Sequence, residues 1–177
     1  KNIPSKKEVK SSVSKVGYQH IELNLRDTTI YLKKKGMKIG FGAIGKGYAA
    51  DQAKALLLKR GITAGVINAS GDINSWGKKP NGDNWQVAII NPLNRKEIYA
   101  SSQIPLGAIV TSGNYEKYIM FNGKRYSHII NPKTGYPASG ITSATVYSLS
   151  AELADALATA IYVMGKDAGF DLINQLP

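Results

Sequence analysis

Hydrophobic and polar positions alternate near the beginning of the chain and predict a β-hairpin there. Apolar residues occupy every second position between His20 and Leu25, the Arg26-Asp27 pair interrupts the pattern, and Thr28 to Leu32 resumes it. Alternation of this kind is typical of paired strands with one buried face. Residues 1–16 are polar and rich in lysine and serine, so we expect a linker or a surface helix before the hairpin.

A helical period follows the hairpin. Within Lys46–Arg60, alanines and leucines recur at the spacing of one helix face, and Gly61 stands where a left-handed C-terminal cap belongs. Near the other end of the chain, Ser150 can cap a second helix that runs to about Met164. Gly165 would end this helix before a short final one.

Short β-rich runs lie between the two helices. Ala64–Asn68, Trp85–Asn91 and Ser143–Leu149 each have the length and composition of a strand. The strongest hairpin signal is in Tyr115–Ile130, which the Asn122-Gly123 pair divides in two. Because Asn-Gly tolerates the positive φ angles of a type I′ turn, we expect two paired strands there.

Composition sets the fold class and the size of the domain. With 177 residues and 43% hydrophobic content, the chain can bury one core, so we expect a single domain over residues 1–177. Strands and helices without regular βαβ alternation favour an α+β class with a mixed, largely antiparallel sheet. The chain has no cysteine, which excludes disulfides, thiolate nucleophiles and cysteine zinc sites.

The formal net charge of +11 is concentrated near the beginning of the chain. Residues 1–40 contain ten lysines and arginines against three acidic residues. A basic surface can bind nucleic acid, but this cluster lacks the interleaved aromatic residues of single-strand binders and any groove-reading motif. We therefore favour a solvated basic surface and expect no nucleic-acid partner.

A glycine-dense loop, Gly40–Gly47, opens directly onto the first predicted helix. Backbone N–H groups at the beginning of a helix can approach phosphate closely, and Lys46 would add positive charge. The spacing matches neither the Walker A loop nor the dinucleotide fingerprint. Two interpretations stay open, a phosphate-binding loop and a plain turn that leads into the helix.

Two stretches of small polar residues, Asn68–Asp72 and Thr111–Asn114, also read as loops. The first follows a predicted strand, and strand ends present unpaired backbone groups to ligands. Equally, each stretch can be a turn that ends a strand, with Asp72 capping it locally.

Three side chains are candidates for catalysis or metal binding. His128 lies on the second strand of the predicted Tyr115–Ile130 hairpin, where it is either a structural histidine or a general base. Asp155 and Thr159 are four residues apart in a helix rich in alanine and leucine, so their oxygens share one face. A carboxylate and a hydroxyl suit Mg²⁺, which prefers oxygen ligands.

Taken in order, these segments resemble the ApbE-type family, the FAD:protein FMN transferases and related FAD pyrophosphatases of bacteria. The resemblance runs from about Val16 to Gly165 and rests on five motifs. They are Gly-x-Ile-x-Lys-Gly-Tyr-Ala (Gly42–Ala49), Asn-Ala-x-Gly-Asp (Asn68–Asp72), Thr-Ser-Gly (Thr111–Gly113), His-Ile-x-x-Pro-x-Thr-Gly (His128–Gly135) and Ala-Asp-Ala-Leu-Ala-Thr (Ala154–Thr159).

The resemblance implies an Mg²⁺-dependent enzyme that cleaves FAD and attaches FMN through a phosphoester bond to a Thr or Ser of an acceptor flavoprotein, releasing AMP. Asp155, Thr159 and the carbonyl of Ala43 would hold the metal, and His128 and Asp155 would be catalytic. The FAD site would be lined by Lys46, Gly47, Asn68, Gly71, Asp72, Ser112, His128 and Ile129. Water in place of the acceptor would give an FAD pyrophosphatase, and binding without turnover a flavin-binding module.

The chain departs from the family pattern in two ways. Gly40 stands where family members usually carry an acidic residue, so recognition of the nucleotide part of FAD would be altered. Family proteins are also longer, with an N-terminal part that supplies some of the flavin pocket and often an export or lipoprotein signal. The resemblance therefore implies the C-terminal part of an ApbE-like domain, and a full-length form in the periplasm or anchored at the outer face of the cytoplasmic membrane.

Overall fold

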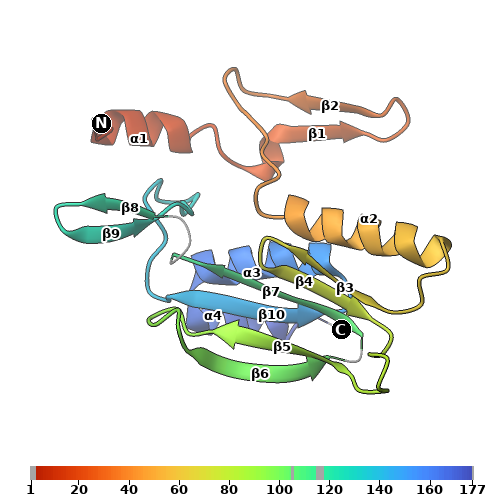
Figure 1. Cartoon of the computed structure of the whole chain (residues 1–177). Helices are drawn as coiled ribbons and strands as arrows, with labels where there is room; N and C mark the ends of the chain where they lie inside the picture. Colours follow the sequence, from red (N-terminus) through yellow and green to blue (C-terminus); the bar gives the residue numbers. More distant parts are fainter. Residues whose placement is uncertain (1–2, 105, 115–117, 177) are drawn as a thin grey trace.

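A computed structural model of the chain describes residues 3–104, 106–114 and 118–176. The elements in chain order are α1 (Lys6–Val13), the 3₁₀ helix η1 (Tyr18–His20), β1 (Ile21–Asn24), β2 (Thr29–Leu32), α2 (Gly45–Lys59), β3 (Gly65–Ala69), β4 (Asp72–Trp76), β5 (Trp85–Ile90), β6 (Ile98–Ile104), β7 (Gly107–Gly113), β8 (Tyr118–Phe121), β9 (Lys124–Ser127), β10 (Ser143–Ser148), α3 (Ala151–Met164) and α4 (Lys166–Ile173) (Figure 1). Helices combined with antiparallel strand pairs confirm the α+β class.

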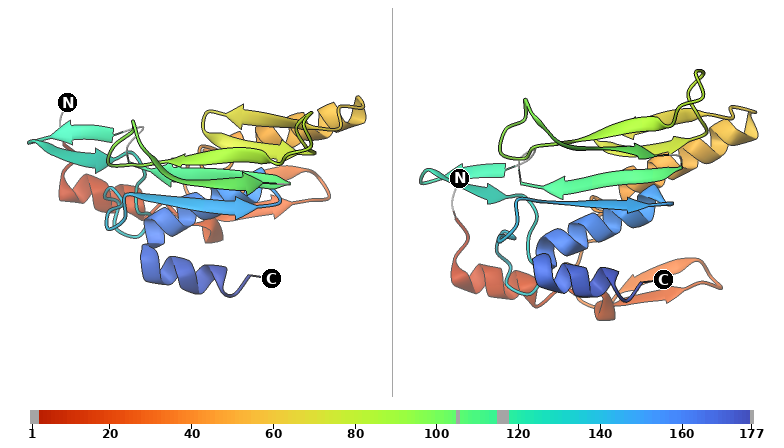
Figure 2. Two further views of the ribbon diagram at one scale, coloured as in Figure 1. Left: turned by 60° about the horizontal axis from the view of Figure 1, so that its bottom comes forward. Right: turned by 90° about the horizontal axis from the view of Figure 1, so that it is seen from below.

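The fold has three layers, and the middle one is a four-stranded sheet of order β10-β7-β4-β3. The helices α2 and α3 cover one face of this sheet, and the β5–β6 ribbon covers the other (Figures 1 and 2). On the helix face, Val110 packs with Ala154 and Ala158 of α3. On the ribbon face, Ile109 packs with Val87 of β5. The core is thus divided between the two faces of one sheet.

Alternation along β7 decides which side chains reach each layer. Val110 faces the helices and Ile109 faces the ribbon. Since successive side chains of a strand point to opposite faces, Ser112 lies on the helix face and Thr111 on the ribbon face. Ser112 is therefore directed toward α3.

The strongest predictions from the sequence are confirmed. Both predicted helices are present, with Ser150 capping α3 by accepting the N–H of Leu153 at 3.1 Å. Gly61 has a φ of 81°, the left-handed geometry expected after α2. The Asn122-Gly123 pair has φ angles of 48° and 73° and joins β8 to β9. Within the predicted Tyr115–Ile130 hairpin, residues 115–117 lie outside the described residues.

Two predictions of local structure were wrong. The Thr111-Ser112-Gly113 stretch is not a loop but the end of β7, paired with residues of β10. The sequence pattern did not predict strand β7. Its first four residues are all buried, so apolar and polar positions do not alternate there, and its last three residues are small. His128 is not on a strand, because β9 ends at Ser127 and the Ser127 hydroxyl accepts the N–H of Ile129 at 3.1 Å, which closes a bend there.

The N-terminal elements α1, β1 and β2 lie apart from the three layers (Figure 1). Helix α1 confirms the expected surface helix, and a capping box between Ser5 and Glu8 begins it. The β1–β2 hairpin is confirmed, but much of it is exposed, including Leu23 and Ile30. In the part of the chain that the structure describes, no helix combines the length and the apolar composition needed to cross a membrane.

Candidate active site

The first turns of α2 and α3 meet at Gly47. A Cβ atom on Gly47 would lie 2.2 Å from the carbonyl oxygen of Ala151, so only glycine permits this contact between the helices. The first four N–H groups of a helix lack acceptors within it. Here the N–H of Gly47 donates to Oδ2 of Asp155 at 3.2 Å. A buried carboxylate of α3 thus caps the N-terminus of α2.

A charged group, which we call the carboxylate cluster, joins Lys46, Asp72 and Asp155. The Lys46 ammonium donates to Oδ2 of Asp72 at 2.6 Å and lies 3.7 Å from Oδ1 of Asp155. The side chains of Asp72 and Asp155 are each 2% exposed, whereas the Lys46 side chain is 42% exposed. The cluster therefore holds two buried negative charges but only one positive charge, which solvent can reach.

Burial and this imbalance both affect the pKa of Asp72. Burial raises the pKa of Asp72 to about 6, the Lys46 ammonium opposes the rise, and the nearby Asp155 adds to it. Burying an uncompensated charge is costly, so such a site favours either a proton or a further cation. The carboxylate cluster is suited to a cation that brings positive charge.

Two hydroxyl groups extend the carboxylate cluster along the helix face. Thr159 lies one turn after Asp155 on α3, and its Oγ1 is 2.9 Å from Oγ of Ser112 on β7. Ser112 and Thr159 are both predicted site residues, and the structure brings them together. Ser112 can hold the Thr159 hydroxyl in one orientation.

The donor atoms fit Mg²⁺ by their chemistry. Asp155 offers a carboxylate and Thr159 a hydroxyl on one helix face, and Mg²⁺ prefers oxygen ligands. Ala43, the third proposed ligand, lies in the exposed turn that leads into α2, three residues before Lys46. Among the described residues, no group of three or more His, Cys, Asp or Glu side chains is placed to hold a metal ion, so such a site would depend on hydroxyl, carbonyl and ligand oxygens.

Asn68 and Gly71 lie on a different side of the sheet. The Oδ1 of Asn68 accepts the N–H of Gly71 at 2.7 Å and closes a turn in which Ser70 and Gly71 have φ angles of 54° and 99°. This geometry matches the turn interpretation of the motif. Both residues, with Thr111, line a cavity of about 260 Å³ between the sheet and β5, whereas Asp72 at the end of the same motif faces the helices.

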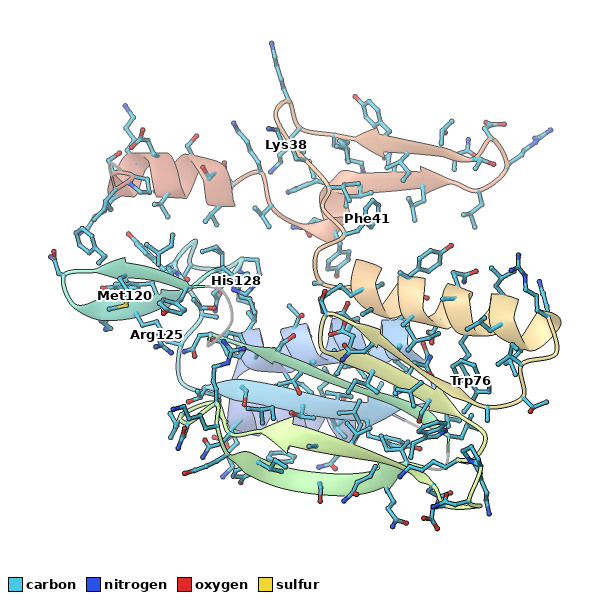
Figure 3. All side chains as sticks on the ribbon, in the orientation of Figure 1. Lys38, Phe41, Trp76, Met120, Arg125 and His128 are labelled. Atoms are coloured by element: carbon cyan, nitrogen blue, oxygen red, sulfur yellow. The ribbon has the colours of Figure 1, made fainter. Side chains whose placement is uncertain are left out.

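His128 and Ile129 occupy the bend after β9. His128 is exposed at the base of the β8–β9 hairpin (Figure 3). The side chain of Ile129 packs against the core cluster of Ala138, Ala144 and Tyr162, and its carbonyl accepts the N–H of Ala138 at 2.8 Å. Ile129 thus anchors the bend that presents His128 to the surface.

Sequence reasoning missed Asp51, whose carboxylate accepts hydrogen bonds from the beginning of α3. The available signal was a lone acidic residue in a predicted helix, one turn after Gly47. Its partners could not be foreseen because they are backbone groups about one hundred residues away along the chain.

Comparison with known sequences identifies the family. Residues 1–177 match the ApbE family. A protein from Escherichia coli K12 named FAD:protein FMN transferase is 32% identical over 177 residues, which cover 98% of this chain and 50% of that protein. One of the same name from Rhodobacter capsulatus is 38% identical over 149 residues, covering 82% of this chain and 28% of the relative.

Solved structures agree with this assignment. The crystal structure of the ApbE protein from Thermotoga maritima matches with a TM-score of 0.91 and 35% identity, over 98% of this chain and 57% of that one. The flavin transferase ApbE from Vibrio cholerae matches with a TM-score of 0.86 and 29% identity, over 99% and 56% of the two chains. The chain spans about half the length of the Escherichia coli relative. With its five motifs, its fold and a family match over residues 1–177, this chain belongs to the ApbE family.

Proposed function

We propose that this chain contributes the FAD-cleaving site of an Mg²⁺-dependent FMN transferase. The transferred FMN would be joined through a phosphoester bond to a Thr or Ser hydroxyl of an acceptor flavoprotein, with AMP as the second product. The observation that carries the proposal is the carboxylate cluster. It brings Lys46, Asp72 and Asp155 together from three of the five family motifs and holds excess negative charge beside the start of α2. The names of the relatives support the choice of FAD and FMN.

Lys46 and the N-terminus of α2 are suited to a diphosphate. The positive end of a helix dipole favours anions, and the exposed ammonium of Lys46 adds a full charge at the same place. Gly47 would contribute through its place in the first turn of α2, next to Lys46. The diphosphate of FAD would therefore approach the carboxylate cluster from the Lys46 side.

Asp155, Thr159 and the carbonyl of Ala43 would hold Mg²⁺. When bound, the ion would neutralise negative charge on the diphosphate and so stabilise the transition state. Asp72 would hold the Lys46 ammonium, and Ser112 would orient Thr159.

His128 would accept the proton of the acceptor hydroxyl. As that oxygen attacks the FMN phosphorus, the bond from this phosphorus to the bridging oxygen breaks and AMP leaves with the electron pair. An exposed histidine suits this role because the acceptor protein must approach from solvent. Asn68, Gly71 and Ile129 are proposed to contact other parts of FAD.

The test measures AMP release from FAD by the purified chain, with a threonine-containing acceptor peptide, in Mg²⁺ and in excess EDTA. The expected result is metal-dependent AMP release with fluorescent flavin fixed to the peptide. The control is the same peptide with valine in place of the threonine, which should stay unlabelled. Free FMN alone would show a pyrophosphatase, and stoichiometric, metal-independent retention of FAD would show a binding module; either result would overturn the transferase.

A further inference from the structure

Asp51, in the second turn of α2, accepts hydrogen bonds from the first residues of α3. Its Oδ1 accepts the N–H of Ala151 at 3.0 Å, and its Oδ2 accepts the N–H of Glu152 at 3.0 Å and the Ser150 hydroxyl at 2.8 Å. A fourth donor, Nδ2 of Asn74, reaches Oδ1 at 2.6 Å. With two donors on each oxygen, Asp51 is engaged in structure and is not itself a ligand for substrate or metal.

The two helices therefore cap each other. Asp155 of α3 accepts an N–H from the first turn of α2, while Asp51 of α2 accepts two N–H groups from the first turn of α3. Gly47 lies one turn before Asp51 on α2, and Ala151 lies one turn before Asp155 on α3. The close contact between Gly47 and Ala151 stands between the two caps, so neither helix can slide without breaking a hydrogen bond to a charged group.

A buried amide aligns the Asp51 carboxylate. Asn74 on β4 is fully buried, and its Oδ1 accepts from the Lys54 ammonium at 2.9 Å. This leaves Nδ2 of Asn74 to donate to Asp51. The Lys54 ammonium also donates to the carbonyl of Ser75 at 3.3 Å, which ties α2 to the sheet.

We infer that Asp51 is a positioning residue for the active site, because it fixes the beginning of α3 against α2 and thereby holds Asp155 at Gly47 and Lys46. The inference rests on the proposed function for the role of Asp155, but its structural part stands on the hydrogen bonds alone. Asp51 would act through Asp155 without contacting FAD or Mg²⁺. Its substitution should therefore weaken metal use more than it weakens the fold.

The first test is hydrogen exchange at the amide of Gly47, whose hydrogen bond to Asp155 is a direct reporter of that alignment. In Asp51→Asn, an amide accepts at only one of the two oxygen positions, so the donors at the other lose their acceptor. We expect exchange at Gly47 to rise by about tenfold relative to the amide of Leu57 in the same helix, as for one weakened hydrogen bond to a charged group. Asp51→Glu keeps the charge and should fold readily, with a smaller rise.

The control is Ser150→Ala, which removes the hydroxyl cap of α3 and one of the four donors to Asp51 but leaves Asp51 bonded to both N–H groups. It should lower the melting temperature without changing exchange at Gly47 relative to Leu57. If exchange at Gly47 rises equally in this control, or does not rise in Asp51→Asn, then Asp51 is only a helix cap and the inference is overturned.

The second test follows AMP release against Mg²⁺ concentration. Asp51→Asn should raise the Mg²⁺ concentration for half-maximal rate by about tenfold, in the range found when residues behind metal ligands are changed, while Ser150→Ala should not. An unchanged Mg²⁺ requirement beside a raised Gly47 exchange would also overturn the active-site role. If the parent chain releases no AMP from FAD, the proposed function fails, and the exchange experiment still decides whether Asp51 positions Asp155.

Discussion

The carboxylate cluster and the His128 bend are built in opposite ways. The first is buried between two helices and a sheet, and each carboxylate has a charged or backbone partner. The second is exposed. Hydrogen bonds of Ser127 and Ile129 and the packing of the Ile129 side chain hold the bend, while His128 itself lies at the surface. A buried, crowded site suits the part of a reaction that must bind charge in one geometry, and an exposed bend suits the part that must meet another protein.

The fold contributes differently to the two roles. In the carboxylate cluster, changing one residue disturbs both stability and chemistry, because the same hydrogen bonds hold the helices together. A substitution of His128 should instead change the chemistry without changing the stability. Substitutions of Asp155, Gly47 and His128 test this separation.

Asp155→Ala should have the largest effect. Losing the proposed metal ligand should lower the rate of AMP release by about a thousandfold, or about 4 kcal/mol in the barrier. The N–H of Gly47 also loses its acceptor, so the free energy of unfolding should fall by about 1–3 kcal/mol. Urea unfolding and AMP release measure the two effects, with Glu152→Ala on the same turn as the control. Equal rates for the variant and its parent at limiting Mg²⁺ would remove Asp155 from the site.

Gly47→Ala should disturb the fold most. The new Cβ would lie 2.2 Å from the carbonyl oxygen of Ala151, so the helices must move apart at a cost of about 3 kcal/mol of unfolding free energy. Gly45→Ala is a matched control in the same turn, since its Cβ would lie 3.6 Å from Phe41 and alanine favours helix. Urea unfolding should rank the control above the parent and Gly47→Ala far below it. Similar curves for the two variants would show that the helices do not meet closely.

His128→Ala should separate chemistry from stability. Losing a general base lowers a rate by about a hundredfold or more, whereas removing an exposed side chain changes the unfolding free energy by about 0.5 kcal/mol at most. The affinity for FAD, measured by flavin fluorescence, should stay close to that of the parent. A shift of the unfolding curve as large as that of Asp155→Ala would make His128 a structural residue and erase the contrast between the two regions.

The sequence predicts local structure well where a residue acts on its neighbours. Asn122-Gly123 forms its turn and Ser150 caps its helix, because both effects depend on groups only a few residues away. The Thr111-Ser112-Gly113 end of β7 was missed because its partners on β10 lie far along the chain. Pairing with a distant strand overrides the loop-like character of small polar residues.

The same reasoning applies to the candidate site. The spacing of Asp155 and Thr159 on one helix was sufficient to predict that they share a face. That Lys46 bridges Asp72 and Asp155 depends on how β4 enters the sheet beside β7, and β4 was not predicted at all. The role of Asp51 was not predicted for the same reason, since its partners are backbone groups of another helix.

The pH dependence of stability should be modest and specific to Asp72. Because its pKa is raised to about 6 in the folded chain, the folded state holds a proton that the unfolded state releases at lower pH. In EDTA, the free energy of unfolding should therefore fall as the pH rises from about 4 to about 6. Urea titrations across this window should show a weaker fall for Asp72→Asn. Asp171→Asn, on the exposed side of α4, is the control, and a reduced slope there instead would contradict the assignment to Asp72.

Tyr162→Phe should have the smallest effect and the opposite sign. Tyr162 lies on α3 beyond Asp155 and belongs to the core cluster against which Ile129 of the His128 bend packs, so this cluster lies between the two regions. Its hydroxyl is buried and has no hydrogen-bond partner among the described residues, and leaving such a group unpaired costs about 1–3 kcal/mol.

Phenylalanine keeps the ring of Tyr162 and removes this cost, so thermal unfolding should show a gain of about 1 kcal/mol with no change in AMP release. Tyr147→Phe is the matched control, because the Tyr147 hydroxyl donates to the carbonyl of Leu106 and its loss should not stabilise the chain. A destabilised Tyr162→Phe would mean that a buried water satisfies the hydroxyl. The junction between the carboxylate cluster and the His128 bend would then contain a polar link that couples them, and the separation of stability from chemistry at His128 should be incomplete.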